Sequence, residues 1–228
     1  TPGAIAPNMR GRDALARLVL NGPFARPVVD YKLRATALGF AGTTVENVYA
    51  EGQARVDANR ILVPVHARAR RVSGLNPAVG GLANNARIDG DIAITWPSVM
   101  SDNMRIRSDN VDATALFAAN IKTGRYTGAF NGRVNNYRVE SIGIINLTTD
   151  AHLVPATRGG FGIAGKVVAR TSRIFNSGVE SFLGGNAVMR ADVGYSPEGI
   201  VTFANLRVNA PQFRVTRGGG RYDPANGK

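Results

Sequence analysis

The sequence predicts an all-β fold, a long antiparallel sheet with one or two short helices, and three observations lead to it. Apolar and polar residues alternate with a period of two over most of the 228 residues, which is the pattern of strands with one apolar and one polar face. The chain holds 27 Gly and 11 Pro, so turn residues recur between the alternating stretches. Short turns separate successive strands, and such connections join antiparallel neighbours.

Residues 1–26 are predicted to form an N-terminal helical or loop segment. A helix from Asn8 to Leu20 would place Leu15, Leu18 and Val19 on one face, and Asn21-Gly22-Pro23 would end it.

Residues 27–172 are predicted to form the main antiparallel array. Asp89-Gly90 has the composition of a two-residue turn, but the alternation continues across it and favours one strand. Ser101-Asp102-Asn103 and Ser108-Asp109-Asn110 indicate turns. Strands are expected over residues 31–37, 48–58, 61–70, 87–95, 113–119, 126–134, 137–139 and 163–169.

Residues 173–228 are predicted to form a short helix followed by further strands of the same array. Ser177-Gly178-Val179-Glu180 fits a capping box, and Gly184-Gly185 fits a C-terminal stop. Val179, Phe182 and Leu183 would form its buried face. Strands are then expected over residues 187–195, 201–208 and 212–216. No domain boundary stands out, and the helix at 173–185 is the best candidate for one.

The predicted apolar faces are rich in Ala, Gly and Val. A compact two-sheet core is filled with bulky side chains, whereas small residues leave room for close backbone approach or for an occupant that is not protein. A structural domain with a closed, dry core, such as a sandwich, a β-helix or an adhesin segment, is the alternative.

No catalytic signature is present, and we expect no enzyme activity, no cofactor and no metal site. The absence of cysteine excludes disulfides, thiolate metal sites and a cysteine nucleophile. His66 and His152 are the only histidines, and neither has the sequence context of a catalytic triad. Asp89 and Asp91 share one strand face and are expected to be solvated.

The chain is basic, with 28 Lys and Arg against 16 Asp and Glu, a net charge of +12. This charge makes a nucleic-acid-binding domain the second alternative. The arginines are spread over the polar faces of many strands, however, and only Arg68, Arg70 and Arg71 form a tight cluster. Because no recognition helix or RNA-binding motif accompanies them, we do not expect nucleic acid as a partner. Solvent, anionic lipid headgroups or lipopolysaccharide would also suit such a face.

Two stretches, residues 184–193 and residues 201–222, resemble the strand–turn pattern of TamB/AsmA-like proteins of Gram-negative envelopes. The likeness extends from about residue 27, through long amphipathic strands with small-residue apolar faces. It implies an open, curved trough of antiparallel strands, a β-taco, with an apolar interior. Because the chain begins at Thr1 without an initiator Met, we expect it to be a fragment of a longer protein.

The resemblance also implies a function. Such proteins are anchored in the inner membrane, extend through the periplasm, and are thought to carry phospholipid acyl chains towards the outer membrane. The expected partners are those acyl chains, neighbouring β segments of the same longer chain and an outer-membrane assembly protein. The residues predicted to line the lipid groove are Leu33, Val48, Val56, Ile61, Val63, Val65, Ile88, Ile92, Ile94, Phe117, Phe130 and Val134.

Overall fold

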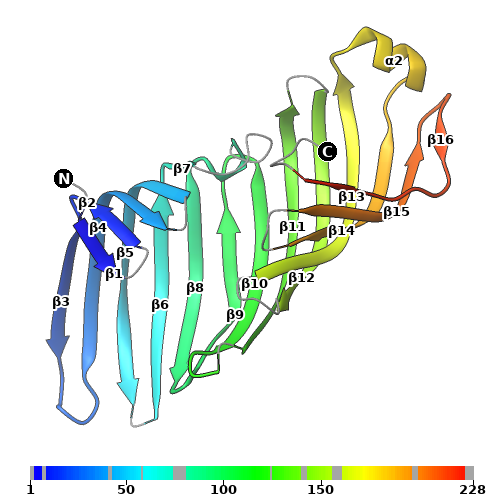
Figure 1. Cartoon of the computed structure of the whole chain (residues 1–228). Coiled ribbons are helices and arrows are strands. Elements are labelled where there is room, and N and C mark those ends of the chain that lie inside the picture. Colours follow the sequence, from blue (N-terminus) through cyan, green and yellow to red (C-terminus); the bar gives the residue numbers. More distant parts are fainter. Residues whose placement is uncertain are drawn as a thin grey trace. The chain divides into compact units, whose positions relative to one another are not determined.

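The chain folds almost entirely into antiparallel strands, as a computed structural model shows (Figure 1). The structure describes residues 3–6, 9–40, 43–57, 59–73, 81–123, 125–139, 143–155, 161–196 and 200–223. The chain divides into two compact units, Thr1–Gly124 and Arg125–Lys228. The division falls inside the predicted 27–172 array, and the helix near residue 180 lies within the second unit.

The first unit is an open sheet of long strands joined mostly by hairpins. The pairing runs β3–β4–β5–β6–β8–β9–β10. In addition, β2 pairs with the C-terminal end of β4, β1 pairs with β2, and β7 pairs with β5. Its elements are β1 (Gly3–Ala6), β2 (Met9–Arg12), β3 (Leu15–Asn21), β4 (Val28–Phe40), β5 (Thr43–Asp57), β6 (Arg60–Ala69), β7 (Arg71–Ser73), the 3₁₀ turn η1 (Gly81–Ala83), β8 (Ala86–Thr95), β9 (Ser98–Arg107) and β10 (Val111–Asn120).

The second unit is also an antiparallel sheet. The pairing runs β11–β12–β13–β14–β15, and both β16 and β17 pair with β15. Its elements are β11 (Arg125–Val139), β12 (Gly143–Pro155), β13 (Phe161–Ile174), α2 (Ser177–Leu183), β14 (Val188–Tyr195), β15 (Val201–Asn209), β16 (Arg214–Val215) and β17 (Gly220–Tyr222). The all-β class and the open antiparallel sheet are confirmed, and so is the single strand through Asp89-Gly90.

The helix predicted from Asn8 to Leu20 is wrong, because Met9–Arg12 and Leu15–Asn21 are strands β2 and β3. A loop over residues 22–27 returns the chain so that β3 pairs with Val28–Arg34 of β4. Gly22 begins this loop with φ 86°, and the Arg26 amide donates to the Pro23 carbonyl at 3.0 Å. That pairing satisfies backbone groups at the edge of β4, whereas a short helix alone would be marginally stable.

The helix predicted after residue 173 is confirmed as α2, but two details of the prediction are wrong. Asn176, not Ser177, is the N-cap, and its side chain accepts a hydrogen bond from the Val179 amide at 3.0 Å. The C-cap is Gly184 with φ 74°, as the stop signal indicates. Of the expected buried face, Val179 and Phe182 are exposed and Leu183 is half-buried. The Phe182 ring packs against the Phe213 ring, with centroids 4.8 Å apart.

The turn predicted at Ser101-Asp102-Asn103 is wrong, since these residues lie within β9. The turn between β9 and β10 does form at Ser108-Asp109-Asn110. There the Ser108 hydroxyl accepts a hydrogen bond from the Val111 backbone amide at 3.1 Å. No strand was expected at β9 or β12. The register shifts by one residue in β9 and at Ile144/Ile145 of β12, so the apolar residues there do not alternate regularly.

Within the described residues, each unit is a single layer of strands with no second layer on either face. The main contacts between elements are those between paired strands. The chain exposes 15062 Å², whereas two compact globular domains of half its mass would together expose about 12,000 Å². In the described residues no large side chain is less than 2% exposed, and the buried positions are mostly Ala, such as Ala35, Ala113 and Ala191.

Asparagines with positive φ mark bulges that bend the strands. Asn136 in β11 and Asn205 in β15 both have φ 51°, and each lies at a shift of register with the neighbouring strand. The backbone amide of Asn136 donates to the side-chain oxygen of Asn146 at 2.9 Å, and the side-chain amide of Asn205 donates to the Asp192 carboxylate at 2.6 Å. These side-chain contacts replace ladder hydrogen bonds that the bulges remove.

Asn136→Val is expected to destabilise the second unit by about 1–2 kcal/mol, because a β-branched residue is strained at positive φ. Asn136→Gly, which tolerates this conformation, is the matched control and should change stability by less. Urea denaturation followed by circular dichroism measures both. Equal midpoints for Asn136→Val and the wild type would contradict the bulge at this position.

Candidate functional site: an uncharged apolar face on each sheet

Cross-strand register places one apolar face on the long strands of the first unit. Val63 of β6 lies opposite Ile92 of β8, and Leu33 of β4 lies opposite Ala50 of β5. Residues that are cross-strand partners share a face. From β3 to β10, with β4 limited to residues 28–35 and β5 to residues 48–57, the register places no charged residue on this face. Glu46 of β5, which lies opposite Ala37 of β4 and Arg71 of β7, marks where the uncharged region ends. We call this uncharged face the first apolar face.

The second unit has an equivalent face. Val134 lies opposite Leu147, Leu147 opposite Ala169, and Ala169 opposite Met189. The register through β11–β15 again leaves this side of the sheet without a charged residue. We call it the second apolar face. The sequence has an extra residue at each of Asn136 and Asn205, and the bulge there accommodates it. The apolar side chains before and after each bulge therefore lie on the same face.

The structure distributes the twelve predicted groove residues over these two faces. Phe130 and Val134 lie on the second apolar face. The other ten share the first: Leu33, Val48, Val56, Ile61, Val63, Val65, Ile88, Ile92, Ile94 and Phe117. All twelve are half-buried, because neighbours on the same face cover them and no further layer is present among the described residues. That they contact lipid stays a prediction.

Several residues on these faces were not predicted. Leu18 and Leu20 of β3 extend the first apolar face, and both are largely exposed, at 66% and 68%. Leu147 and Leu153 of β12 belong to the second apolar face. A period of two is present in both stretches. In β3 the apolar residues fit a helical period equally well. In β12 the adjacent Ile144 and Ile145 interrupt the alternation of apolar and polar residues.

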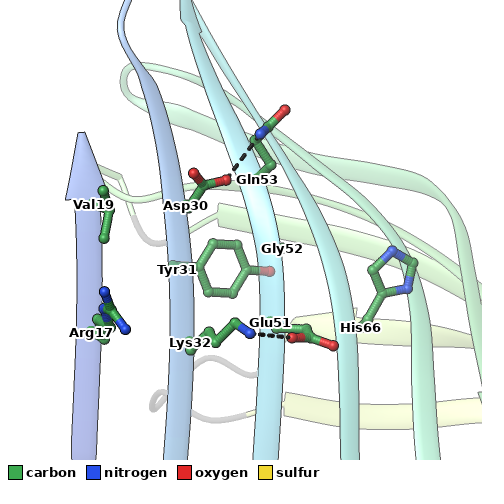
Figure 2. Close-up of a pocket in the computed structure, with 9 residues that line it drawn as sticks. All are labelled: Arg17, Val19, Asp30, Tyr31, Lys32, Glu51, Gly52, Gln53 and His66. Atoms are coloured by element: carbon green, nitrogen blue, oxygen red, sulfur yellow. Dashed lines mark hydrogen bonds and ion pairs between the residues drawn. The ribbon is translucent and has the colours of Figure 1, made fainter. Parts of the chain in front are cut away.

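Tyr31 closes a gap in the first apolar face (Figure 2). Its ring extends from β4 across Gly52 of β5, and its hydroxyl donates a hydrogen bond to the Pro64 carbonyl of β6. Only glycine at position 52 leaves room for the ring. The β5–β6 ladder has no bridge partners between Glu51 and Arg55, and Pro64 has no amide to donate there. Partial burial raises the pKa of the Tyr31 phenol above its ordinary value.

The polar face of the first unit bears a depression of about 550 Å³ around these residues. Its polar groups pair with one another: Lys32 with Glu51 at 3.4 Å, and Gln53 with Asp30 at 2.9 Å (Figure 2). His66 is exposed and lies 3.1 Å from Asp89, one of the two acids expected to be solvated. Asp91 exchanges hydrogen bonds with Asn103 across the β9 bulge. In the described part of the chain, no group of three His, Asp or Glu residues could hold a metal ion.

The Glu51 carboxylate has a pKa below its ordinary value, chiefly because the Tyr49 hydroxyl donates to it at 2.6 Å, and also because Lys32 and Arg68 are near. Tyr49→Phe is therefore expected to raise the Glu51 pKa towards 4.5. Because the folded-state pKa is lowered, the associated stability is present above the ordinary pKa and is lost as pH falls through the lowered one. NMR titration of the Glu51 side chain tests this, with Tyr31→Phe as the control. An unchanged pKa in Tyr49→Phe would contradict the assignment.

Comparisons with known proteins find no counterpart for this chain. No protein-family model, no curated protein and no solved structure matches it. The likeness to TamB/AsmA-like proteins is therefore an inference from the sequence pattern. In the part of the chain that the structure describes, no helix has the length and apolar character needed to cross a membrane.

Proposed function

We propose that this chain is a non-enzymatic segment of a lipid-transfer protein, and that phospholipid acyl chains lie along the apolar face of each sheet. The observation that carries the proposal is a continuous uncharged face on a single-layer sheet. Its side chains are half-exposed, and no layer formed by the described residues covers them. Exposed apolar surfaces of more than a few hundred Å² mark binding sites in soluble proteins.

Acyl chains suit this face better than a discrete small molecule does. Each buried methylene contributes about 0.8 kcal/mol, and the contribution is similar wherever the face is apolar. A face without charges or polar anchors would therefore hold a chain without a deep local minimum. That property permits movement along the sheet, which a transfer protein requires.

A closed, dry core is the less favoured alternative. A scaffold domain of that kind would bury large aliphatic side chains, whereas the described residues buried here are mostly Ala.

The TamB/AsmA-like resemblance extends the proposal to a cellular setting. In that setting the chain works in the periplasm, as part of a longer protein anchored in the inner membrane, and passes phospholipid towards the outer membrane. Neighbouring β segments of the same protein would pair with the free edges of the sheets. An outer-membrane assembly protein is the proposed terminal partner.

The test is lipid analysis of the purified chain. Organic extraction followed by mass spectrometry should find phospholipid in at least equimolar amount, and it should resist gel filtration. A chain that folds, by circular dichroism, yet carries no lipid and takes up none from vesicles would overturn the proposal.

A further inference from the structure

Register aligns a row of cationic residues on the polar face of the first unit. Arg34 of β4 lies opposite Tyr49 of β5, and Tyr49 lies opposite Arg68 of β6. Arg68 lies opposite Arg87 of β8, and Arg87 lies opposite Arg107 of β9. All four arginines are exposed. We call these five residues the arginine row.

The arginine row places like charges side by side. Directly opposed residues of an antiparallel pair have Cβ atoms about 4.5–5.5 Å apart, and like charges at such positions are destabilising. Arg68 with Arg87, and Arg87 with Arg107, form two such pairs in succession. Among the residues that the structure describes, no carboxylate lies within 4.0 Å of the guanidinium groups of these three arginines.

The adjacent cross-strand positions show the opposite arrangement. Lys32 pairs with Glu51 at 3.4 Å, and His66 lies 3.1 Å from Asp89. Asp112 of β10 lies opposite Arg107, but both of its carboxylate oxygens accept hydrogen bonds from Arg105 at 3.2 Å. The acids beside the arginine row, and Asp112 opposite Arg107 at its end, therefore contact cations outside the row. The guanidinium groups of Arg68 and Arg87 are left to contact another anion.

One end of the arginine row is held in place by an aromatic ring. The Arg34 and Arg68 guanidinium carbons lie 5.4 and 4.7 Å from the centroid of the Tyr49 ring. The Tyr49 hydroxyl is fixed in turn by Glu51 at 2.6 Å. Guanidinium groups ordered in this way can present paired N–H donors to phosphate oxygens, which suits bidentate recognition.

We propose that the arginine row binds phosphate groups, either of free oligophosphates or of anionic phospholipid headgroups at a lipid surface. The site lies on the side of the sheet opposite the first apolar face, so it does not rest on the proposed function. Single-stranded nucleic acid fits less well. Tyr49 is the one aromatic side chain described on the polar face of these strands, and it already stacks on two arginines rather than being available to a base.

Thermal denaturation at low ionic strength with pyrophosphate as the probe tests the site. Pyrophosphate at ten times its Kd should raise the Tm of the wild type by about 3–6 °C. Arg87→Gln should weaken pyrophosphate binding about tenfold or more, and without the anion it should raise the Tm, because a repelled charge is removed. The control is Arg55→Gln, an equal loss of charge on β5 outside the arginine row, which should keep the pyrophosphate response.

Vesicle sedimentation identifies the source of the phosphate. Binding to phosphatidylglycerol-containing vesicles that Arg87→Gln loses and Arg55→Gln keeps would assign the site to a lipid surface. Pyrophosphate binding without vesicle binding would assign it to free phosphates. Binding to pure phosphatidylcholine vesicles reports on the apolar faces and should not depend on Arg87.

Two results would overturn the proposal. In the first, the responses of Arg87→Gln to pyrophosphate and to vesicles match those of the wild type. In the second, neither pyrophosphate nor phosphatidylglycerol-containing vesicles bind the wild type; a loss of salt-dependent duplex DNA retention in Arg87→Gln would then assign the arginine row to nucleic acid.

Discussion

Val65→Glu is expected to remove most of the phospholipid that co-purifies with the chain. Val65 is half-buried near the middle of β6, where it lies opposite Gly90 on the first apolar face. A carboxylate there would have to lose its hydration against an acyl chain, with no cation on that face to pair with it. We expect the bound lipid per protein, measured by extraction and mass spectrometry, to fall at least tenfold.

Thr114→Glu is the control for this variant, because Thr114 is exposed on the polar face of β10, opposite Arg105. It should leave the lipid content unchanged. Should Val65→Glu fail to fold, Ile92→Asp on β8 and Ala115→Glu on β10 test the same face. Ala115 is the residue next to Thr114, so the two variants compare the two faces at one place. A folded Val65→Glu or Ala115→Glu protein with wild-type lipid content would refute acyl-chain binding on this face.

Gly52→Ala is expected to destabilise the first unit by about 1–3 kcal/mol, the range typical of overpacking. A Cβ atom at position 52 would lie 2.6 Å from the Tyr31 hydroxyl oxygen and 2.8 Å from its Cε1 atom, and it would also contact the Pro64 carbonyl. The ring would have to leave Gly52 and lose its hydrogen bond to Pro64. Chemical denaturation of the purified variant measures the change in unfolding free energy.

A double-mutant cycle makes this second prediction specific. Tyr31→Leu removes the ring, so Gly52→Ala should be less destabilising in the Tyr31→Leu background than in the wild type. Gly178→Ala in α2, where a Cβ would meet only the Asn176 side chain at 3.2 Å, is the control and should be close to neutral. Strict additivity of Tyr31→Leu and Gly52→Ala would show that the ring and the glycine do not depend on each other.

Much of the candidate site could be predicted from alternation alone. In a strand, side chains two positions apart lie on the same side, so Ile61, Val63 and Val65 had to share a face once β6 was recognised. The same logic joined Ile88, Ile92 and Ile94 on β8. It failed from Asn8 to Leu20, where Leu15, Leu18 and Val19 satisfy a helical period and Ala16, Leu18 and Leu20 satisfy a strand period. Pairing with β4, a contact distant in sequence, decided between them.

The bulges could not be predicted for a related reason. Asn136 and Asn205 are residues that tolerate positive φ, but many Asn residues in the chain do not adopt it. Whether an extra residue is accommodated depends on the strand opposite, through partners such as Asn146 and Asp192. The irregular strands β9 and β12 were missed because their register shifts break the period of two that marks a strand.

The sequence by itself determined that most of this chain is made of strands and that one side of most predicted strands is apolar, because the period of two follows from local backbone geometry. It did not determine which strands lie side by side. Only the tertiary structure decided that the apolar sides join into one face per sheet, which no other described part of the chain covers, and that Arg68, Arg87 and Arg107 become neighbours. Both outcomes depend on register, which is set by hydrogen bonds between segments that are far apart in the chain.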